Sequence, residues 1–269
     1  MKPWLLILPA LLLLSCQPSG SERPLSAGKP VVQVTTYPLH YFTERIAGDA
    51  IDLHFLPGET SGDPAYWKPS DDAVAAYQAA DLIIMNGAGY EKWMATVSLP
   101  RSTRVDTSRQ FAVRYISSDG VVHTHGDGKA HSHGEIAYTT WLDPHQAQQQ
   151  VLVITQALSE ILPAADSNFK SNSQALIADL KQLDSHFQST TAPLKDQRVL
   201  VSHDIYQYFS RRYGFETIAV NAAPSDPPSV EFLAELDKAI SETSASVMLW
   251  EAAPNEAMMQ ALKQRELTV

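Results

Sequence analysis

Short apolar runs alternate with helix-forming segments along most of this 269-residue chain. The β-branched run VVQVTTY (31–37) precedes the helix-like segment PLHYFTERIAG, and the nearly continuous apolar run AADLIIMNG (79–87) follows DDAVAAYQA. An unbroken apolar strand is expected in a parallel sheet that is covered on both faces. The same alternation returns near the end of the chain in RVLVSHD, ETIAVN and VMLWEA. Repeated strand–helix order predicts the α/β class, with doubly wound sheets.

A purely helical stretch separates the two alternating regions. Pro163 divides it into expected helices at about 145–161 and 166–188, and the second has no internal Gly or Pro. That helix would be about 35 Å long at 1.5 Å per residue, enough to join two domains. The expected order is an N-terminal α/β domain, a helical linker and a C-terminal α/β domain, at residues 30–142, 143–192 and 193–269. The final residues LTV read as the opening of another strand, so the C-terminal domain is expected to be incomplete.

Four histidines fall within eleven residues, in the segment HTHGDGKAHSH. Neutral imidazole is the commonest protein ligand for zinc, and short His-rich tracts are typical of metal binding. The intervening glycines and charges favour a mobile surface loop, at about 119–135, over a buried strand. Residues two apart on an extended segment share a face, so each pair is a candidate to bind one ion. The candidate ligands in this loop are His123, His125, His131 and His133.

The N-terminus predicts export. Residues 1–15 carry Lys2 before an apolar run that is too short to span a membrane, which is typical of a secretory signal peptide. A small residue then precedes Cys16, the single cysteine, in a pattern that resembles the lipobox of bacterial lipoproteins. Residues 16–29 are rich in Ser, Pro and Gly and predict a flexible tether. We therefore expect an extracytoplasmic protein that is lipid-anchored to a membrane through Cys16.

Charge and motif content exclude several functions. Acidic residues outnumber basic ones by 30 to 20, which disfavours nucleic acid or an anionic membrane surface as a partner and is compatible with cations. The sequence has no HExxH metalloprotease motif, no GxSxG nucleophile motif and no Gly-rich phosphate loop. Catalysis is therefore not expected, and a binding function is favoured over an enzyme.

Four segments carry a resemblance to a known family: PLHYFTERIAGD, DPAYWKPSDDAVAAYQAADLIIMNGAGYEKWM, TTWLDPHQA and SHDIYQYFSRRYGF. Together with the strand–helix order, they resemble the zinc and manganese solute-binding lipoproteins of bacterial ABC importers over residues 30–269. The resemblance implies two α/β domains joined by a rigid helix, metal capture between the domains, and delivery to an ABC permease. It also implies a protein that acts as a monomer.

The ligand positions of that family are only partly present. Two positions that usually hold histidine are Ala65 and Thr139 here, whereas the histidine of the SHDAY-like segment is present as His203. Histidine at this third position resembles the zinc-type members, and the chain ends before the fourth, acidic ligand. His203 with loop histidines would form a nitrogen-rich site suited to Zn²⁺, with Mn²⁺, Cu²⁺ or Ni²⁺ as other candidate ions.

Two alternatives to this site stay open. In one, the loop is a low-affinity metal collector and another cargo binds between the domains, where Tyr66 and Trp67 would line the site. In the other, the protein is a degenerate binding protein that acts as a sensor or partner. His40 and Glu251 are weaker candidate ligands because each follows a predicted strand. Asp204 is a candidate acceptor that would orient an imidazole.

Overall fold

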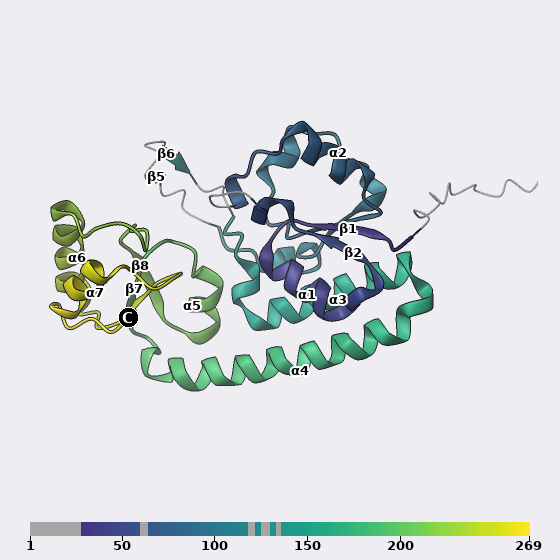
Figure 1. The fold of residues 1–269 in the computed structure, drawn as a ribbon. Coiled ribbons are helices and arrows are strands. Elements are labelled where there is room, and N and C mark those ends of the chain that lie inside the picture. Colours follow the sequence, from purple (N-terminus) through teal and green to yellow (C-terminus); the bar gives the residue numbers. More distant parts are fainter. Residues whose placement is uncertain (1–27, 60–63, 118–121, 125–129, 133–135) are drawn as a thin grey trace, which may run out of the picture.

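The computed structural model describes residues 28–59, 64–117, 122–124, 130–132 and 136–269, and it contains two separate parallel sheets (Figure 1). The N-terminal lobe has a four-stranded sheet in the order β2-β1-β3-β4, with β1 (Val31–Val34), β2 (Asp52–His54), β3 (Leu82–Met85) and β4 (Arg104–Asp106). The C-terminal lobe has a three-stranded sheet in the order β8-β7-β9, with β7 (Arg198–Val201), β8 (Glu216–Ala219) and β9 (Met248–Leu249). All pairings in both sheets are parallel, which confirms the α/β class.

Three capped helices complete the N-terminal lobe: α1 (Tyr37–Ala47), α2 (Asp71–Ala79) and α3 (Pro144–Ile161). The side chains of Thr36, Ser70 and Asp143 accept hydrogen bonds from backbone N–H groups in the first turns of these helices. Such caps satisfy donors that the helix itself leaves without partners. Strands β1 and β3 pack with α1 and α3 in one fully buried apolar cluster, which includes Val34, Ile84, Leu39, Ile154 and Leu158.

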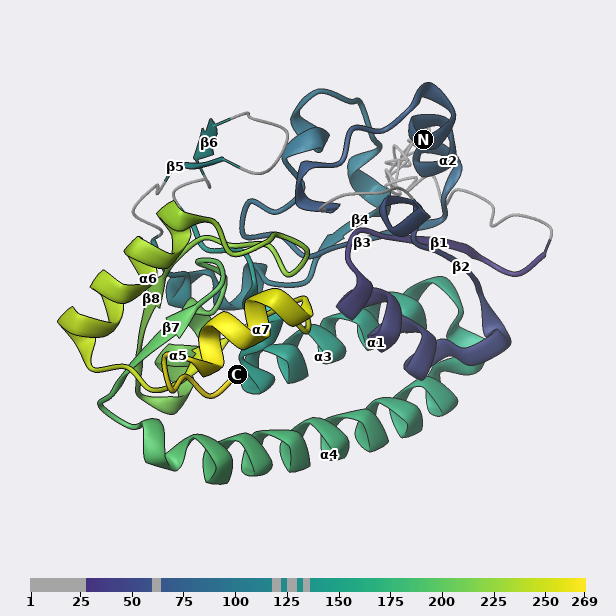
Figure 2. The same ribbon diagram turned by 60° about the vertical axis from the view of Figure 1, so that its left-hand side comes forward.

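Helix α4 (Asp166–Thr191) runs along one side of the molecule and reaches the C-terminal lobe in both views (Figures 1 and 2). Its Leu176 and Leu180 belong to the N-terminal apolar cluster. Near its other end, the Phe187 ring lies 5.1 Å from Phe209 of α5 (Gln207–Tyr213). The expected uninterrupted helix is therefore confirmed, and its two ends pack on different lobes.

The C-terminal lobe has its own apolar core. Strands β7 and β9 pack with α6 (Val230–Thr243) and α7 (Glu256–Lys263) in a cluster that includes Leu200, Met248, Leu236, Met258 and Leu262. The expected strand at LTV is represented by an isolated parallel bridge between Thr268 and Val247.

The His-rich segment contains a short antiparallel hairpin of β5 (Val122–Thr124) and β6 (Ala130–Ser132), in which His123 and His131 are register partners. These six residues form strands within the expected surface loop 119–135, whose bounds stay a prediction. His125 and His133 lie outside the described residues, as do the predicted signal peptide, Cys16 and most of the tether.

Short 3-10 turns connect the main elements, at Gly48–Ala50, Leu56–Glu59, Pro64–Tyr66, Lys92–Ala95, Arg101–Thr103, Arg109–Arg114, Thr140–Leu142, Pro163–Ala165 and Ala192–Leu194. Among the helices of the described residues, none combines the length and the apolar character needed to cross a membrane.

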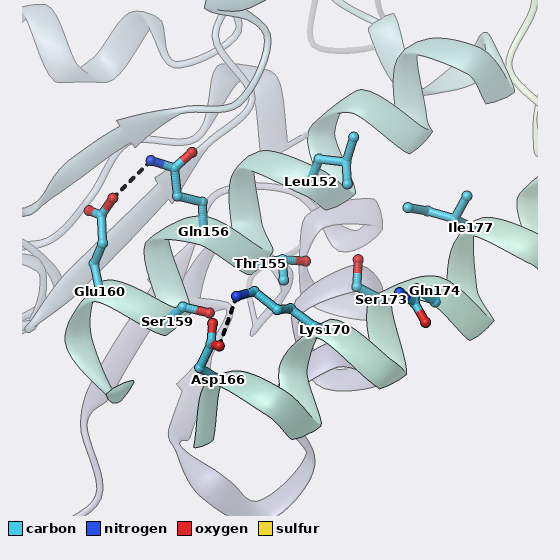
Figure 3. Close-up of a pocket in the computed structure, with 10 residues that line it drawn as sticks. All are labelled: Leu152, Thr155, Gln156, Ser159, Glu160, Asp166, Lys170, Ser173, Gln174 and Ile177. Atoms are coloured by element: carbon cyan, nitrogen blue, oxygen red, sulfur yellow. Dashed lines mark hydrogen bonds and ion pairs between the residues drawn. The ribbon is translucent and has the colours of Figure 1, made fainter. Parts of the chain in front are cut away.

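A groove of about 430 Å³ lies between α3 and α4 (Figure 3). Leu152 and Ile177 form part of its wall, and an ion pair between Asp166 and Lys170 lies at one end. Its lining contains no histidine or cysteine, so its chemistry differs from that of a zinc site.

Candidate metal site

His203 and Glu251 form a close pair at the carboxyl ends of two neighbouring strands. Strands β7 and β9 are parallel, with Val201 opposite Leu249, and the same register continued by two residues brings His203 beside Glu251. The Nδ1 atom of His203 lies 2.7 Å from Oε1 of Glu251. The His203 side chain is 13 % exposed and that of Glu251 is 37 % exposed. Parallel sheets bind ligands beyond the carboxyl ends of their strands, so the pair lies where a ligand is expected.

Tyr206 adds a neutral hydroxyl near this pair. Burial, together with the negative charge of Glu251, raises the pKa of Tyr206 to about 12. The phenol therefore stays protonated around neutral pH. The sequence did not single out Tyr206, although it lies in the same SHDIY segment as His203.

The acid in contact with the imidazole is Glu251, 2.7 Å from Nδ1, and the orienting role predicted for Asp204 stays a prediction. Asp204, for which this role is predicted, lines a small space of about 10 Å³ together with Thr139 and Ile205. The backbone carbonyl of Asp204 accepts a hydrogen bond from the side chain of Gln207 at 2.8 Å.

The two N-terminal positions that usually hold histidine are packed into the protein. Ala65 is 2 % exposed and belongs to an apolar cluster with Ala88, Tyr90 and Tyr138. Thr139 is also buried, and its hydroxyl donates a hydrogen bond to the carbonyl oxygen of Ile205 at 2.5 Å. Neither side chain offers the nitrogen or carboxylate ligand that a zinc ion needs.

A buried carboxylate fixes the loop that carries Ala88 and Tyr90. Glu91 accepts hydrogen bonds from the Thr35 hydroxyl at 2.6 Å, from Asn86 N at 2.6 Å and from Gly87 N at 3.1 Å. Burial raises the pKa of the Glu91 carboxyl to about 7, and these hydrogen bonds oppose the shift. No sequence pattern singles out Glu91, because its burial depends on how the loop folds back against β1.

Gly87 lies within the same loop at a φ of +77°. A Cβ atom there would meet Oδ1 of Asp106 at 2.0 Å, so both the backbone conformation and the close approach require glycine.

The two lobes contact each other directly near Thr139. The Tyr208 hydroxyl donates to the carbonyl oxygen of Ala137 at 2.8 Å. Arg212 of α5 forms an ion pair with Asp184 of α4, and its Nη1 atom lies 3.3 Å from Oδ1 of Asp143 at the start of α3. Direct protein contacts therefore hold the lobes together on this side of the interface.

The remaining candidate residues have other contacts. The His40 ring lies 6.3 Å from the rings of both Tyr37 and Phe55. Trp67 packs against Trp93 and Tyr77 at 5.2 and 6.0 Å. Lys92 lies over the Tyr66 ring, with its Nζ atom 5.2 Å from the ring centroid. The roles proposed for these residues as ligands or lining groups stay predictions.

Within the described ranges of the chain, no three His, Cys, Asp or Glu side chains gather closely enough to hold a metal ion. His203 is thus a fixed imidazole with a carboxylate partner, and further ligands would have to come from segments outside these ranges or from a rearrangement.

Comparisons with known proteins agree with this architecture. The sequence model of the family ZnuA, described as zinc-uptake complex component A periplasmic, matches residues 32–268. The zinc-binding lipoprotein AdcA of Streptococcus pneumoniae is 27 % identical over 266 residues, which cover 94 % of this chain and 50 % of AdcA. The high-affinity zinc uptake system protein ZnuA of Bacillus subtilis is 28 % identical over 247 residues, which cover 90 % of this chain and 77 % of that protein. The chain thus spans about half the length of AdcA.

Solved structures share the fold. The metal-dependent lipoprotein YcdH of Bacillus subtilis has a TM-score of 0.71 at 24 % identity, covering 88 % of this chain and 85 % of that one. The periplasmic zinc-binding protein TroA of Treponema pallidum has a TM-score of 0.67 at 22 % identity, covering 90 % and 86 %. These similarities confirm the predicted arrangement of two α/β lobes and a long connecting helix.

Proposed function

Because the chain belongs to the ZnuA family, zinc-uptake complex component A, we propose that it is the substrate-binding component of a metal-ion ABC importer. In this proposal it captures Zn²⁺ between the two lobes and releases it to an ABC permease. The protein acts by binding and is not an enzyme. The zinc-binding names of AdcA and the Bacillus subtilis ZnuA support zinc as the ion.

The position of His203 is the observation that carries the proposal. It is a largely buried imidazole at the edge of a parallel sheet where such sheets bind ligands, and the resemblance of its SHDIY segment implies a ligand histidine there. Since Ala65 and Thr139 provide no metal ligand, the remaining donors in this proposal are imidazoles of the segment 119–135. A set of imidazoles favours Zn²⁺ over Mn²⁺ but accepts Cu²⁺ and Ni²⁺.

The proposal extends to location and organisation. Cys16 would carry a lipid and hold the protein at an extracytoplasmic membrane face, with residues 16–29 as the tether. The domain division would follow the expected bounds, 30–142, 143–192 and 193–269, and the protein would work as a monomer.

Zinc titration against a competing chelator tests the proposal in three variants of the full chain. We expect His203→Ala to weaken zinc binding by at least about 100-fold, because a lost imidazole ligand has no substitute nearby. Replacing the four loop histidines by alanine should weaken it similarly. The control is His186→Ala, which removes an exposed imidazole from α4. Unchanged affinity in His203→Ala would contradict a site at His203.

The packing of Ala65 and the hydrogen bond of Thr139 favour a second candidate, a protein whose His-rich segment only collects metal. In that case the loop variant alone would lose zinc binding, and His203→Ala would match His186→Ala.

A further inference from the structure

The turn at 86–90 follows strand β3 and has a strained backbone. Its residues Gly87, Ala88 and Gly89 have successive positive φ angles of 77°, 51° and 78°. A left-handed conformation is costly for Ala88, which has a Cβ atom, so contacts with the rest of the lobe must maintain the turn. The buried side chain of Glu91 provides such contacts.

Both carboxyl oxygens of Glu91 accept hydrogen bonds. Oε1 lies 2.6 Å from Asn86 N and 2.6 Å from the Thr35 hydroxyl, and Oε2 lies 3.1 Å from Gly87 N. The Thr35 hydroxyl also lies 3.5 Å from the carbonyl oxygen of Ile84, which is a second acceptor for its proton. When Oε1 carries a proton, Thr35 can therefore accept from Glu91 and donate to Ile84. The same arrangement thus accommodates the protonated carboxyl.

The surroundings of Glu91 favour this protonated form. The residue is 8 % exposed, and no Lys, Arg or His in the described part of the chain forms an ion pair with it. The ionisable groups that face it are the phenols of Tyr77 and Tyr115, and Asp106 of β4 lies against the turn at Gly87. None of these groups can offset a negative charge, so burial raises the pKa of the Glu91 carboxyl to about 7.

The turn is bonded to the segment before α3, and that segment contacts the C-terminal lobe. The side-chain amide of Asn86 donates to the carbonyl oxygen of Tyr138 at 2.8 Å and accepts from the Thr140 hydroxyl at 3.1 Å. Between these two residues, the Thr139 hydroxyl donates to the carbonyl oxygen of Ile205 in the C-terminal lobe. A short path of hydrogen bonds therefore leads from the turn to the interlobe interface.

We infer that Glu91 is a proton-controlled latch, which keeps the turn 86–90 closed when its carboxyl is protonated and favours opening of the turn when the carboxyl ionises. Water hydrates an ionised carboxylate better than the buried site does, so opening is the way to relieve the charge. Opening frees Asn86 from residues 138–140 and so loosens the adjoining contact with the C-terminal lobe. The latch is a property of the metal-free protein and does not rest on the proposed function.

Amide hydrogen exchange of the metal-free full chain, followed by NMR at several pH values, tests the latch. After correction for intrinsic exchange rates, the opening constants at Asn86 N and Gly87 N should rise by about 50- to 100-fold from pH 5 to pH 8, because the carboxyl pKa falls from about 7 to its ordinary value of 4.5 when the turn opens. Glu91→Gln cannot ionise and should lack this rise. The control Glu242→Gln, which neutralises an exposed acid of α6, should behave like the wild type.

Two readouts in the wild type need no variant. The ¹³C chemical shift of the Glu91 carboxyl carbon should titrate with a midpoint near pH 7. The amide of Thr140, which is bonded to the Tyr138 carbonyl at 2.8 Å, should open with the same pH dependence as the turn. The control amide is Met258 N, which is bonded to Asn255 in the C-terminal lobe and should show no comparable rise.

A carboxyl midpoint near 4.5, or opening constants at Asn86 and Gly87 that do not change with pH, would overturn the latch. A rise that persists in Glu91→Gln would assign the effect to another group. Equal opening constants for the turn and for the amides of β3 would mean that the turn opens only when the lobe unfolds. A Thr140 amide that ignores the pH would show that the turn does not act on the interlobe contact.

Discussion

The N-terminal and C-terminal sides of the interlobe interface have different chemistry. On the N-terminal side, Ala65 is packed among aromatic rings and the Thr139 hydroxyl is hydrogen-bonded to the opposite lobe. On the C-terminal side, His203 and Glu251 remain partly exposed and lie 2.7 Å apart, an imidazole beside a carboxylate. The N-terminal positions are therefore filled by packed, non-ligating side chains, whereas the C-terminal positions hold an imidazole and a carboxylate. In the proposed function, metal binding would therefore depend on His203 and on the His-rich segment.

Among the substitutions considered, Ala65→His is expected to cause the largest loss in the free energy of unfolding, because Ala65 is closely packed. Ala65→His would restore the usual imidazole but place a large polar ring at a position that is 2 % exposed. We expect the free energy of unfolding to fall by at least about 3 kcal/mol, from overpacking and from burial of a polar group. Urea denaturation measures it, with Ala257→His on the exposed face of α7 as the control. A fully stable Ala65→His protein would show that this side has room for a ligand.

The buried Glu91 makes the N-terminal side sensitive to pH. Its folded-state pKa of about 7 lies above its ordinary value of 4.5, so the folded protein holds the proton more tightly than the unfolded chain. This contribution to stability is present below pH 4.5 and is lost as the pH rises to about 7, by about 3 kcal/mol in total.

Denaturation of wild type and Glu91→Gln across this pH range checks the effect. The amide of the Glu91→Gln variant cannot ionise, so the variant should not lose this contribution. Its free energy of unfolding should therefore rise relative to that of the wild type as the pH rises. Parallel pH profiles for the two proteins would mean that Glu91 is not held in a buried, protonated form.

Arg212 of α5 forms ion pairs with Asp143 at the start of α3 and with Asp184 of α4, and so connects the two lobes. We expect Arg212→Ala to lower the free energy of unfolding by about 2 kcal/mol, because it leaves two partly buried carboxylates without their partner. The control is Arg265→Ala, whose partner Asp237 is 57 % exposed and lies within the same lobe, and it should cost less. Equal losses in the two variants would mean that Arg212 has no special role between the lobes.

Of these substitutions, Thr139→Val is expected to lower the free energy of unfolding the least. Thr139→Val keeps the shape of the side chain but removes the hydroxyl that donates to Ile205. We expect a loss of about 1 kcal/mol in urea denaturation and a zinc affinity close to that of the wild type. A large loss of zinc affinity would indicate that the Thr139 side contributes to the site after all.

Local sequence patterns predicted the elements but not the contacts between them. The uninterrupted periodicity of 166–188 and the apolar run at 79–87 were sufficient to predict α4 and β3, because each depends on its own residues. His203 was found from its motif. Glu251 was a weaker candidate because it follows a predicted strand, but its contact with His203 was not predicted, since that contact requires the pairing of β7 with β9. The bond from Thr139 to Ile205 depends on how the lobes pack, which no local pattern encodes.

A crystal structure of the full chain with bound zinc tests the central claim most directly. We predict a zinc ion at about 2.0–2.1 Å from a ring nitrogen of His203, with histidines of the segment 119–135 completing the site. A zinc ion bound only by that segment, with His203 outside its coordination sphere, would contradict the account.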